Sequence, residues 1–302
     1  MNKPDLEILK KNEPIYVIGH SHIDVDSAVS SKIFSNILNY FGIKSFYVIL
    51  DQNYEFDEFN KKMLFDCMNF NPVIIKQSEI NNYNYFLIDH NDRTQSVGIQ
   101  ANVIGALDHH PKANNVNNIV IGDTCSISLY LYKIYKDVYK FSNEEKKQIF
   151  FAFLSDSSFG TSSRFHESDK LLADELGFGS DYYNLFKKYF IPTDISNNFK
   201  NALFNGNKKY LFGDISFESA YVEMLGIEKL NDYKELIKKQ NNFLGIWFDY
   251  ENKKTYAFFI YDGKFIEKEY NFIASRSTTI LKDILPYLNI KMDWLILNFD
   301  IF

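Results

Sequence analysis

The stretch IYVIGHSHIDVDS at positions 15–27 decides the fold, because it joins a buried strand to the start of a helix. Its first part, Ile15–Gly19, is a short apolar run that predicts a strand covered on both faces. Apolar side chains then recur at helical spacing over Asp26–Phe41, which predicts a helix directly after the strand. Polar residues at such a junction lie at the carboxyl edge of a parallel sheet, where these sheets bind ligands.

The same alternation continues through the first half of the chain. Further strands are predicted at 46–50, 72–75, 85–88 and 103–107, and further helices at 58–70, 125–139 and 143–154. Ser142, with Glu145 three residues later, is typical of an N-terminal cap for the last of these helices. Strands that alternate with helices predict an α/β domain whose mainly parallel sheet has helices on both faces.

The pattern changes at Ile191–Asn198, where Pro192 and polar residues predict a linker. We therefore expect three parts: a first domain at 1–190, the linker at 191–198 and a second domain at 199–302. Strands are predicted in the second domain at 210–216, 219–223, 244–250, 255–261 and 294–299, and helices at 226–240 and 278–285. This smaller domain is expected to be α/β with a mixed sheet, and the active site is expected in the cleft between the domains.

Composition excludes several classes of protein. With 46% hydrophobic and 24% charged residues, the 302-residue chain is too apolar to be disordered. It has no run of about 18 apolar residues, and its polar N-terminus does not resemble a secretory signal, so we expect no membrane association. The net charge of −6 argues against nucleic acid as a partner. Two cysteines far apart, Cys67 and Cys125, favour a reducing, cytoplasmic location.

Carboxylates and imidazoles gather where the predicted strands end and where the helix at 143–154 ends. The residues concerned are His20, Asp24, Asp26, Asp89, His90, Asp108, His109, His110 and Asp156. Taken alone, Asp24 and Asp26 are equally well explained as helix caps. Together, so many carboxylates would raise one another's pKa unless cations were bound. Oxygen and nitrogen ligands without thiolate suit Mn²⁺, Co²⁺, Fe²⁺ or Zn²⁺, and a pair of such ions about 3.5–4 Å apart can activate a water molecule to attack phosphorus.

These segments resemble the motifs of the Asp-His-His phosphoesterase superfamily, and most closely those of its family II (manganese-dependent) inorganic pyrophosphatases. The first motif of that family reads Gly-His-x-x-Pro-Asp-x-Asp-Ser, and the chain has GHSHIDVDS at 19–27, with Ile23 at the proline position. The segment GDTCS at 122–126 resembles the family's Gly-x-Thr-Ala-Thr. All the motifs stand in the family's order.

The resemblance implies a role for each of these residues. It assigns one metal to His20 and Asp24 and a second metal to Asp26, His109 and Asp156, with Asp89 as the bridge. Asp108 would orient its neighbours, and His110 would contact substrate phosphate and help to protonate the leaving group. Asp89, Asp108 and His110 are thus the implied catalytic residues. The implied cofactors are two Mn²⁺ or Co²⁺ ions, with a further Mg²⁺ that arrives with the substrate.

The second domain bears on the substrate. The chain lacks any Gly-Gly pair, and so lacks the glycine-rich ending of the superfamily branch that acts on nucleic acids and small phosphodiesters. Its ASRS segment at 274–277 resembles the family's Ser-Arg-Lys, which implies that Arg276 and the position of Ser277 bind substrate. Lys200, six residues before Gly206, resembles the family's other phosphate-binding lysine. A surface ion pair for Arg276 and a solvated surface position for Lys200 are the alternatives.

The implied activity is hydrolysis of phosphoanhydride bonds, with pyrophosphate converted to two orthophosphates by a metal-bridged hydroxide. Ser277 stands where the family has a lysine, and Lys282 is a candidate substitute for that lysine. The loss of one cation leaves two alternatives open: an exopolyphosphatase acting on short or long polyphosphate, and a non-catalytic metal-binding relative with an interaction role. Dimers are common in the family, so a homodimer is one expected state, although the residues predict no interface.

Four more polar residues lie near the motifs. We expect His22 to line the site without binding metal, and His90 to be a hydrogen-bonded neighbour of the ligands. Arg164 and His166, just beyond Asp156, could reach substrate, but a plain loop role is the favoured expectation.

Overall fold

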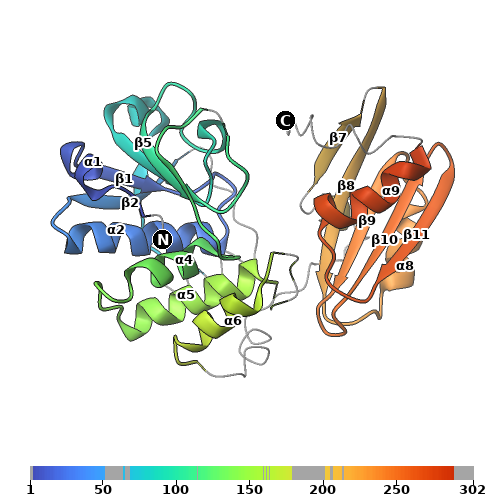
Figure 1. Cartoon of the computed structure of the whole chain (residues 1–302). Helices are drawn as coiled ribbons and strands as arrows, with labels where there is room; N and C mark the ends of the chain where they lie inside the picture. The colour runs from blue at the N-terminus through green and yellow to red at the C-terminus, as the bar shows by residue number, and fades with distance from the viewer. Residues whose placement is uncertain are drawn as a thin grey trace. The chain divides into compact units, whose positions relative to one another are not determined.

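The computed structural model describes residues 3–51, 64, 69–113, 115–158, 160, 162, 164–178, 201–204, 207–212 and 214–288. Packing divides the chain into a first unit, Met1–Gly160 with Arg164–Phe190, and a second unit, Thr161–Ser163 with Ile191–Phe302. Figure 1 shows both units, and each is described by itself. The predicted linker, Lys200, Cys67, the strand at 294–299 and most of the helix at 58–70 lie outside the described residues.

The first unit is built on a six-stranded parallel sheet, which confirms the predicted fold class. Its strands are β1 (Ile15–Ile18), β2 (Ser45–Leu50), β3 (Val73–Ile75), β4 (Asn84–Ile88), β5 (Asn102–Asp108) and β6 (Ile119–Ile121). Their order is β3-β2-β1-β4-β5-β6, and every neighbouring pair is parallel. This is the doubly wound order, in which the chain reverses direction across the sheet between β1 and β4.

Helices α2, α4 and α5 lie on one face of this sheet (Figure 1). The helices of the unit are α1 (Leu6–Lys11), α2 (Val25–Tyr40), α4 (Ile127–Tyr135), α5 (Asn143–Asp156) and α6 (Glu167–Asp174). Side chains alternate between faces, so Val17 packs under these α-helices and Ile18 packs on the opposite face. That opposite face is covered by the 3₁₀ helix η2 (Gln77–Asn82) and by the segment after the 3₁₀ helix η3 (Arg93–Gln95).

Local contacts fix where two of these helices begin. Asp24 caps α2, because its Oδ1 accepts the backbone N–H of Ser27 at 2.8 Å. The strand before it approaches this first turn so closely that a Cβ on Gly19 would lie 1.9 Å from Ser27 Oγ, which explains the glycine. Ser142 and Glu145 form the predicted capping box of α5.

The second unit has a mixed five-stranded sheet, again as predicted. Its strands are β7 (Lys208–Phe212), β8 (Ile215–Met224), β9 (Phe243–Asp249), β10 (Lys254–Tyr261) and β11 (Lys264–Tyr270), in the order β11-β10-β9-β8-β7. Only β8 and β9 are parallel, and the helix α8 (Leu230–Ile237) makes their crossover. This helix packs on one face of the sheet, and α9 (Leu281–Ile284) packs on the other (Figure 1).

Several element boundaries differ from the sequence-based expectation. The single strand expected at 210–216 is two strands separated by a turn at Asp214, and the helix expected at 226–240 is shorter. The helix expected at 278–285 begins earlier, as the π-helical turn η5 (Arg276–Ile280), and continues past α9 as the 3₁₀ helix η6 (Leu285–Leu288). Pro286 lacks the N–H of an α-helical bond, so the chain tightens there instead of stopping.

Four elements were not predicted: α1, β6, α6 and β11. The last of these strands alternates polar and apolar residues without a strong apolar run. Among the described residues, no helix combines the length and the apolar character that crossing a bilayer requires.

Candidate metal centre

The polar segments after β1, β4 and β5 meet at one edge of the first sheet. β1 and β4 are neighbours at the point where the strand order reverses, and a doubly wound sheet has its ligand crevice there. Asp89 follows β4 with a φ of +61°, a left-handed conformation that Asp tolerates better than most residues. Its backbone N–H donates to Leu107 O of β5 at 2.9 Å. The turn therefore aims a buried carboxylate at the sheet edge.

Three side chains form a first group of possible metal ligands. His20 Nε2 lies 3.4 Å from Asp24 Oδ2 and 3.4 Å from Asp89 Oδ2. Ligand atoms of these three residues all lie within 4.8 Å of one another. The group matches the first predicted set, with Asp24 supplying one oxygen to the cap of α2 and the other to the cluster.

A second group consists of Asp26, Asp89, His109 and Asp156, whose ligand atoms also lie within 4.8 Å of one another. His109 Nε2 is 3.2 Å from Asp89 Oδ1 and 3.7 Å from Asp156 Oδ2. Asp89 is common to both groups, and its two oxygens face different imidazoles: Oδ2 faces His20 and Oδ1 faces His109. A carboxylate placed in this way can bridge two cations.

Asp108 organises the turn that carries the two following histidines. It is fully buried, and its Oδ1 accepts the backbone N–H of His109 at 2.7 Å and Nδ1 of His110 at 2.8 Å. Its Oδ2 accepts the side-chain amide of Asn91. Burial would raise the pKa of Asp108, but the hydrogen bonds from His110 and Asn91 lower it below the ordinary value. With both oxygens engaged, Asp108 orients its neighbours and is poorly placed to bind a cation, although its ligand atoms lie near the cluster.

Hydrogen bonds also assign the tautomer of His109. Its Nδ1 lies 3.2 Å from the carbonyl oxygen of Thr124, which can only accept, so Nδ1 carries the proton. The Nε2 lone pair then points into the cluster, as a metal-binding imidazole requires. The segment 122–126, which sequence analysis singled out, therefore supports the ligand set from outside it.

Asp26 has a second role that the sequence did not reveal. Its oxygens accept hydrogen bonds from Ser126 Oγ at 2.8 Å, from the backbone N–H of Ile127 at 2.6 Å and from that of Ser128 at 3.0 Å. Asp26 thus neutralises the amino end of α4, about a hundred residues away along the chain. The helix-capping alternative is correct to this extent, but the capped helix is α4 and Asp26 still lies in the second group.

The electrostatics of the cluster call for cations. Burial, and then the charges of Asp26 and Asp24, raise the pKa of Asp156 well above its ordinary value. Burial also raises the pKa of Asp26, with Asp89 as the next cause. Asp89 Oδ1 is buried and accepts no hydrogen bond among the described residues, although His109 Nε2 is 3.2 Å away. Donors that converge on a point without bonding one another fit a divalent metal ion.

The imidazoles are tuned by the same carboxylates. Burial would lower the pKa of His20, but Asp24 and Asp89 raise it well above the ordinary value. His90 is different: it is buried away from the groups, bonded to Ile88 O and Ser96 Oγ, and its pKa falls to about 4 because of burial and the charge of His20. This agrees with its expected place beside the ligands. His22 is exposed and belongs to neither ligand group.

Arg164 is the residue that sequence reasoning placed wrongly. We expected a plain loop position, yet its Nη1 lies 2.9 Å from His109 Nε2 and 3.2 Å from His110 Nε2. No periodicity or motif in the sequence marks it. Its neighbour His166 instead donates its backbone N–H to Asp169 at the start of α6.

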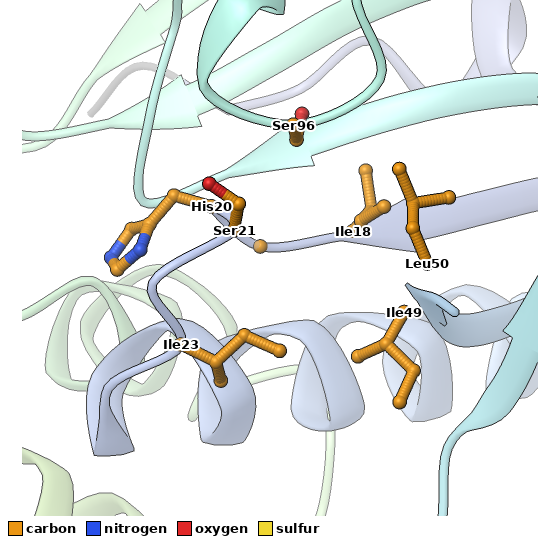
Figure 2. Close-up of a pocket in the computed structure, with 8 residues that line it drawn as sticks. Ile18, His20, Ser21, Ile23, Ile49, Leu50 and Ser96 are labelled. Carbon is orange, nitrogen blue, oxygen red and sulfur yellow. The ribbon is translucent and has the colours of Figure 1, made fainter. Parts of the chain in front are cut away.

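A small hollow adjoins the cluster at the ends of β1 and β2. It is lined by Ile18, Gly19, His20, Ser21, Ile23, Ile49, Leu50 and Ser96. Figure 2 shows the imidazole of His20 turned away from the apolar side chains of Ile18, Ile49 and Leu50. An apolar lining offers little to a phosphate, so the hollow packs behind His20, and the chemistry lies on the carboxylate side.

In the second unit, Arg276 lies at the start of η5 with its guanidinium 5.5 Å from the ring centre of Tyr221. Lys208 pairs with Ser219 across β7 and β8, and so shares the sheet face of Ser219 and Tyr221. Desolvation, and then the charge of Arg276, lower the pKa of Lys208, so the two cations are within electrostatic reach. Ser219 Oγ is buried without a hydrogen-bond partner among the described residues. Ser277 follows Arg276 in η5.

Lys208 was missed because the chain has two consecutive lysines, and only strand register decides which face each occupies. The lysine position predicted from the motifs, Lys200, cannot be compared with it, since it lies outside the described residues.

No protein-family model matches the chain. Among curated proteins, a manganese-dependent inorganic pyrophosphatase of Methanothrix thermoacetophila is 25% identical to it over 236 residues, which are 74% of each chain. The sequence match agrees with the resemblance drawn from the motifs.

Two solved structures share the fold. The crystal structure of a candidate family II inorganic pyrophosphatase from Methanococcus jannaschii covers 91% of this chain and 100% of its own, with a TM-score of 0.65 and 16% identity. An exopolyphosphatase-related protein from Bacteroides fragilis covers 94% of this chain and 96% of its own, with a TM-score of 0.53 and 14% identity.

Proposed function

From the premise that the chain has the fold of the family II inorganic pyrophosphatases and resembles them in sequence, we propose that it hydrolyses pyrophosphate to two orthophosphates. The observation that carries this proposal is the position of Asp89, whose two oxygens face two separate ligand groups. Phosphoanhydride hydrolysis by a pair of divalent cations needs such a shared carboxylate.

We propose that the cations are two Mn²⁺ or Co²⁺ ions, held by His20 and Asp24 on one side of Asp89 and by Asp26, His109 and Asp156 on the other. A further Mg²⁺ would enter with the substrate. Carboxylate and imidazole donors without thiolate support this choice of metal. When bound, such a pair supplies a nucleophilic water at neutral pH and neutralises charge on the phosphoryl oxygens.

His110 is the residue best placed to move a proton. Its side chain is 47% exposed, while its Nδ1 is fixed at 2.8 Å from the buried carboxylate of Asp108. A carboxylate on one nitrogen stabilises the doubly protonated ring and fixes its orientation, so that Nε2 can donate a proton to a leaving phosphate. Asp108 in this scheme positions His110 and does not touch the substrate.

Two divalent cations would offset four carboxylates, so the charge of a phosphate substrate must be met by other side chains. We propose that Arg276 and Lys208 of the second unit, on one face of its sheet, bind substrate phosphate. Guanidinium and ammonium groups are the usual protein ligands of phosphate oxygens. Ser277 leaves this pair without a further lysine beside it.

Exopolyphosphatase activity is the second candidate, and the observation in its favour is Ser277, since a site with fewer cations binds a compact tetra-anion less well. The fold shared with an exopolyphosphatase-related protein is compatible with it. A reducing, cytoplasmic location is proposed as well, in keeping with Cys125, which is a buried free thiol.

The test is the release of orthophosphate by the purified chain with Mn²⁺, measured side by side on pyrophosphate and on tripolyphosphate. We expect pyrophosphate to be the faster substrate. A faster rate on tripolyphosphate would favour the exopolyphosphatase, and no release from either substrate by a chain that binds Mn²⁺ would favour the non-catalytic alternative.

A further inference from the structure

The guanidinium of Arg164 occupies an unusual position at the edge of the candidate metal centre. A single nitrogen, Nη1, lies within hydrogen-bond distance of the Nε2 atoms of both His109 and His110. These two rings have different expected tasks, since His109 belongs to a ligand group and His110 to the substrate side. Arg164 therefore stands at the boundary between the cations and the substrate.

The backbone around Arg164 is fixed although the side chain is exposed. The next residue, Phe165, packs against the core of the first unit, with its ring 6.2 Å from that of Phe153. The residue after that, His166, donates its N–H to Asp169, which is buried at the start of α6. Arg164 is thus presented to the cluster by anchored neighbours, and the two contacts with imidazoles do not come from a loose loop.

The contact with His109 conflicts with metal binding. The Nε2 of His109 has one lone pair, because its Nδ1 proton is directed at Thr124 O. That lone pair can accept from Arg164 or bind a cation, and cannot do both. A cation in the second group must therefore release the guanidinium from His109, while the position of its backbone keeps it beside His110.

A released guanidinium at this place faces the site of an anionic substrate. On the basis of the proposed function, we propose that Arg164 is a phosphate-binding residue that is held by His109 and His110 when no cation is bound and contacts substrate phosphate oxygens once the cation is in place. It would supply, from the first unit, one cation toward the charge that Ser277 does not meet. Arginine suits this task because its planar donors match two phosphate oxygens.

This inference predicts opposite effects on two equilibria. In Arg164→Ala, Mn²⁺ should bind more tightly than in the wild type, by about threefold or more, because no guanidinium competes for His109 or repels the cation. The same variant, loaded with Mn²⁺, should bind imidodiphosphate about tenfold more weakly. Arg164→Lys should recover part of the imidodiphosphate affinity. A purely structural role would weaken both equilibria together.

Both affinities are measured by titration calorimetry on the full chain, with thermal unfolding as the check of folding. Lys170→Ala is the matched control, since Lys170 is an exposed cation on the neighbouring helix α6, paired with Glu167, and should change neither affinity. Imidodiphosphate affinity within twofold of the wild type, or a loss of Mn²⁺ affinity, in Arg164→Ala would overturn the inference. Pyrophosphate hydrolysis by the wild type is measured separately: its absence contradicts the proposed function, and a wild type that does not bind imidodiphosphate contradicts both.

Discussion

The two units of this chain carry charge in different ways. The first unit gathers carboxylates and imidazoles at one sheet edge, where Asp26, Asp89 and Asp108 are almost fully buried. The second unit presents Lys208 and Arg276 on the face of a mixed sheet, beside Tyr221. Buried charges of one sign are costly without counter-charge, whereas cations at a surface are stable in water. The first arrangement therefore requires a bound cation, and the second is suited to a transient anionic ligand.

The difference predicts a division of effects between the units. Substitutions in the first unit should remove metal and activity together, while substitutions in the second unit should weaken substrate binding with little effect on metal. Each prediction below sharpens or breaks that division.

The largest effect is expected from Asp89→Asn. Loss of the shared carboxylate should weaken Mn²⁺ binding in both groups and lower pyrophosphate hydrolysis by about a thousandfold or more. Asn tolerates the positive φ of this position, so the backbone should be preserved. Orthophosphate release and Mn²⁺ stoichiometry are the measurements. Asp123→Asn, which removes an exposed carboxylate paired with Lys133, is the control and should leave both unchanged.

The next effect separates two neighbouring lysines of β7. Lys208→Ala should raise KM for pyrophosphate by about tenfold, because a charge-assisted contact to phosphate is lost. Lys209 pairs with Glu218 and points to the opposite face, so Lys209→Ala should leave KM unchanged. Steady-state kinetics with saturating Mn²⁺ checks this. Equal effects of the two substitutions would mean that the face shared with Arg276 does not bind substrate.

A smaller effect in the opposite direction is expected from Ser277→Lys. A lysine after Arg276 should lower KM for pyrophosphate roughly fivefold, since an additional ion pair at an exposed site is worth about 1 kcal/mol. Ser277→Met adds a side chain of comparable length without charge and is the control. If both variants shift KM alike, length and not charge is responsible, and the argument from the missing lysine fails.

The smallest effect concerns the helix that carries Asp156. Burial would raise the pKa of Glu145, but hydrogen bonds from Ser142, Tyr139 and Asn36 lower it below the ordinary value. A lowered pKa in the folded state contributes stability at pH above the unfolded value of about 4.3 and loses it as the pH falls through the folded pKa. Glu145→Gln should therefore lower the free energy of unfolding by about 1–2 kcal/mol at pH 7 and by less in acid.

Denaturant unfolding at pH 7 and near pH 4 measures this change. Glu144→Gln is the matched control, because Glu144 is exposed one residue before Glu145 in the same first turn. A difference between wild type and Glu145→Gln that does not shrink in acid would show that the ionised carboxylate is not the stabilising form.

Sequence reasoning succeeded where chemistry follows directly from a strand. His20, Asp89 and the Asp108–His110 turn come immediately after apolar runs, and parallel strands bring their carboxyl ends to one edge. It failed where position depends on contacts that are distant in sequence. Arg164 reaches the cluster from an irregular segment, and Asp26 caps a helix about a hundred residues away.

Register was the other source of error. Lys208 is indistinguishable from Lys209 until the pairing of β7 with β8 is known. The strand β11 escaped prediction because its residues, KFIEKEY, lack a strong apolar run and are completed only by pairing with β10. Propensity is a weak guide for edge strands of this kind.

The most direct test of the account is the anomalous diffraction of crystals grown with Mn²⁺. The account predicts two manganese peaks joined by Asp89, one beside His20 and Asp24 and the other beside Asp26, His109 and Asp156. A single peak, or two peaks that do not share Asp89, would contradict it.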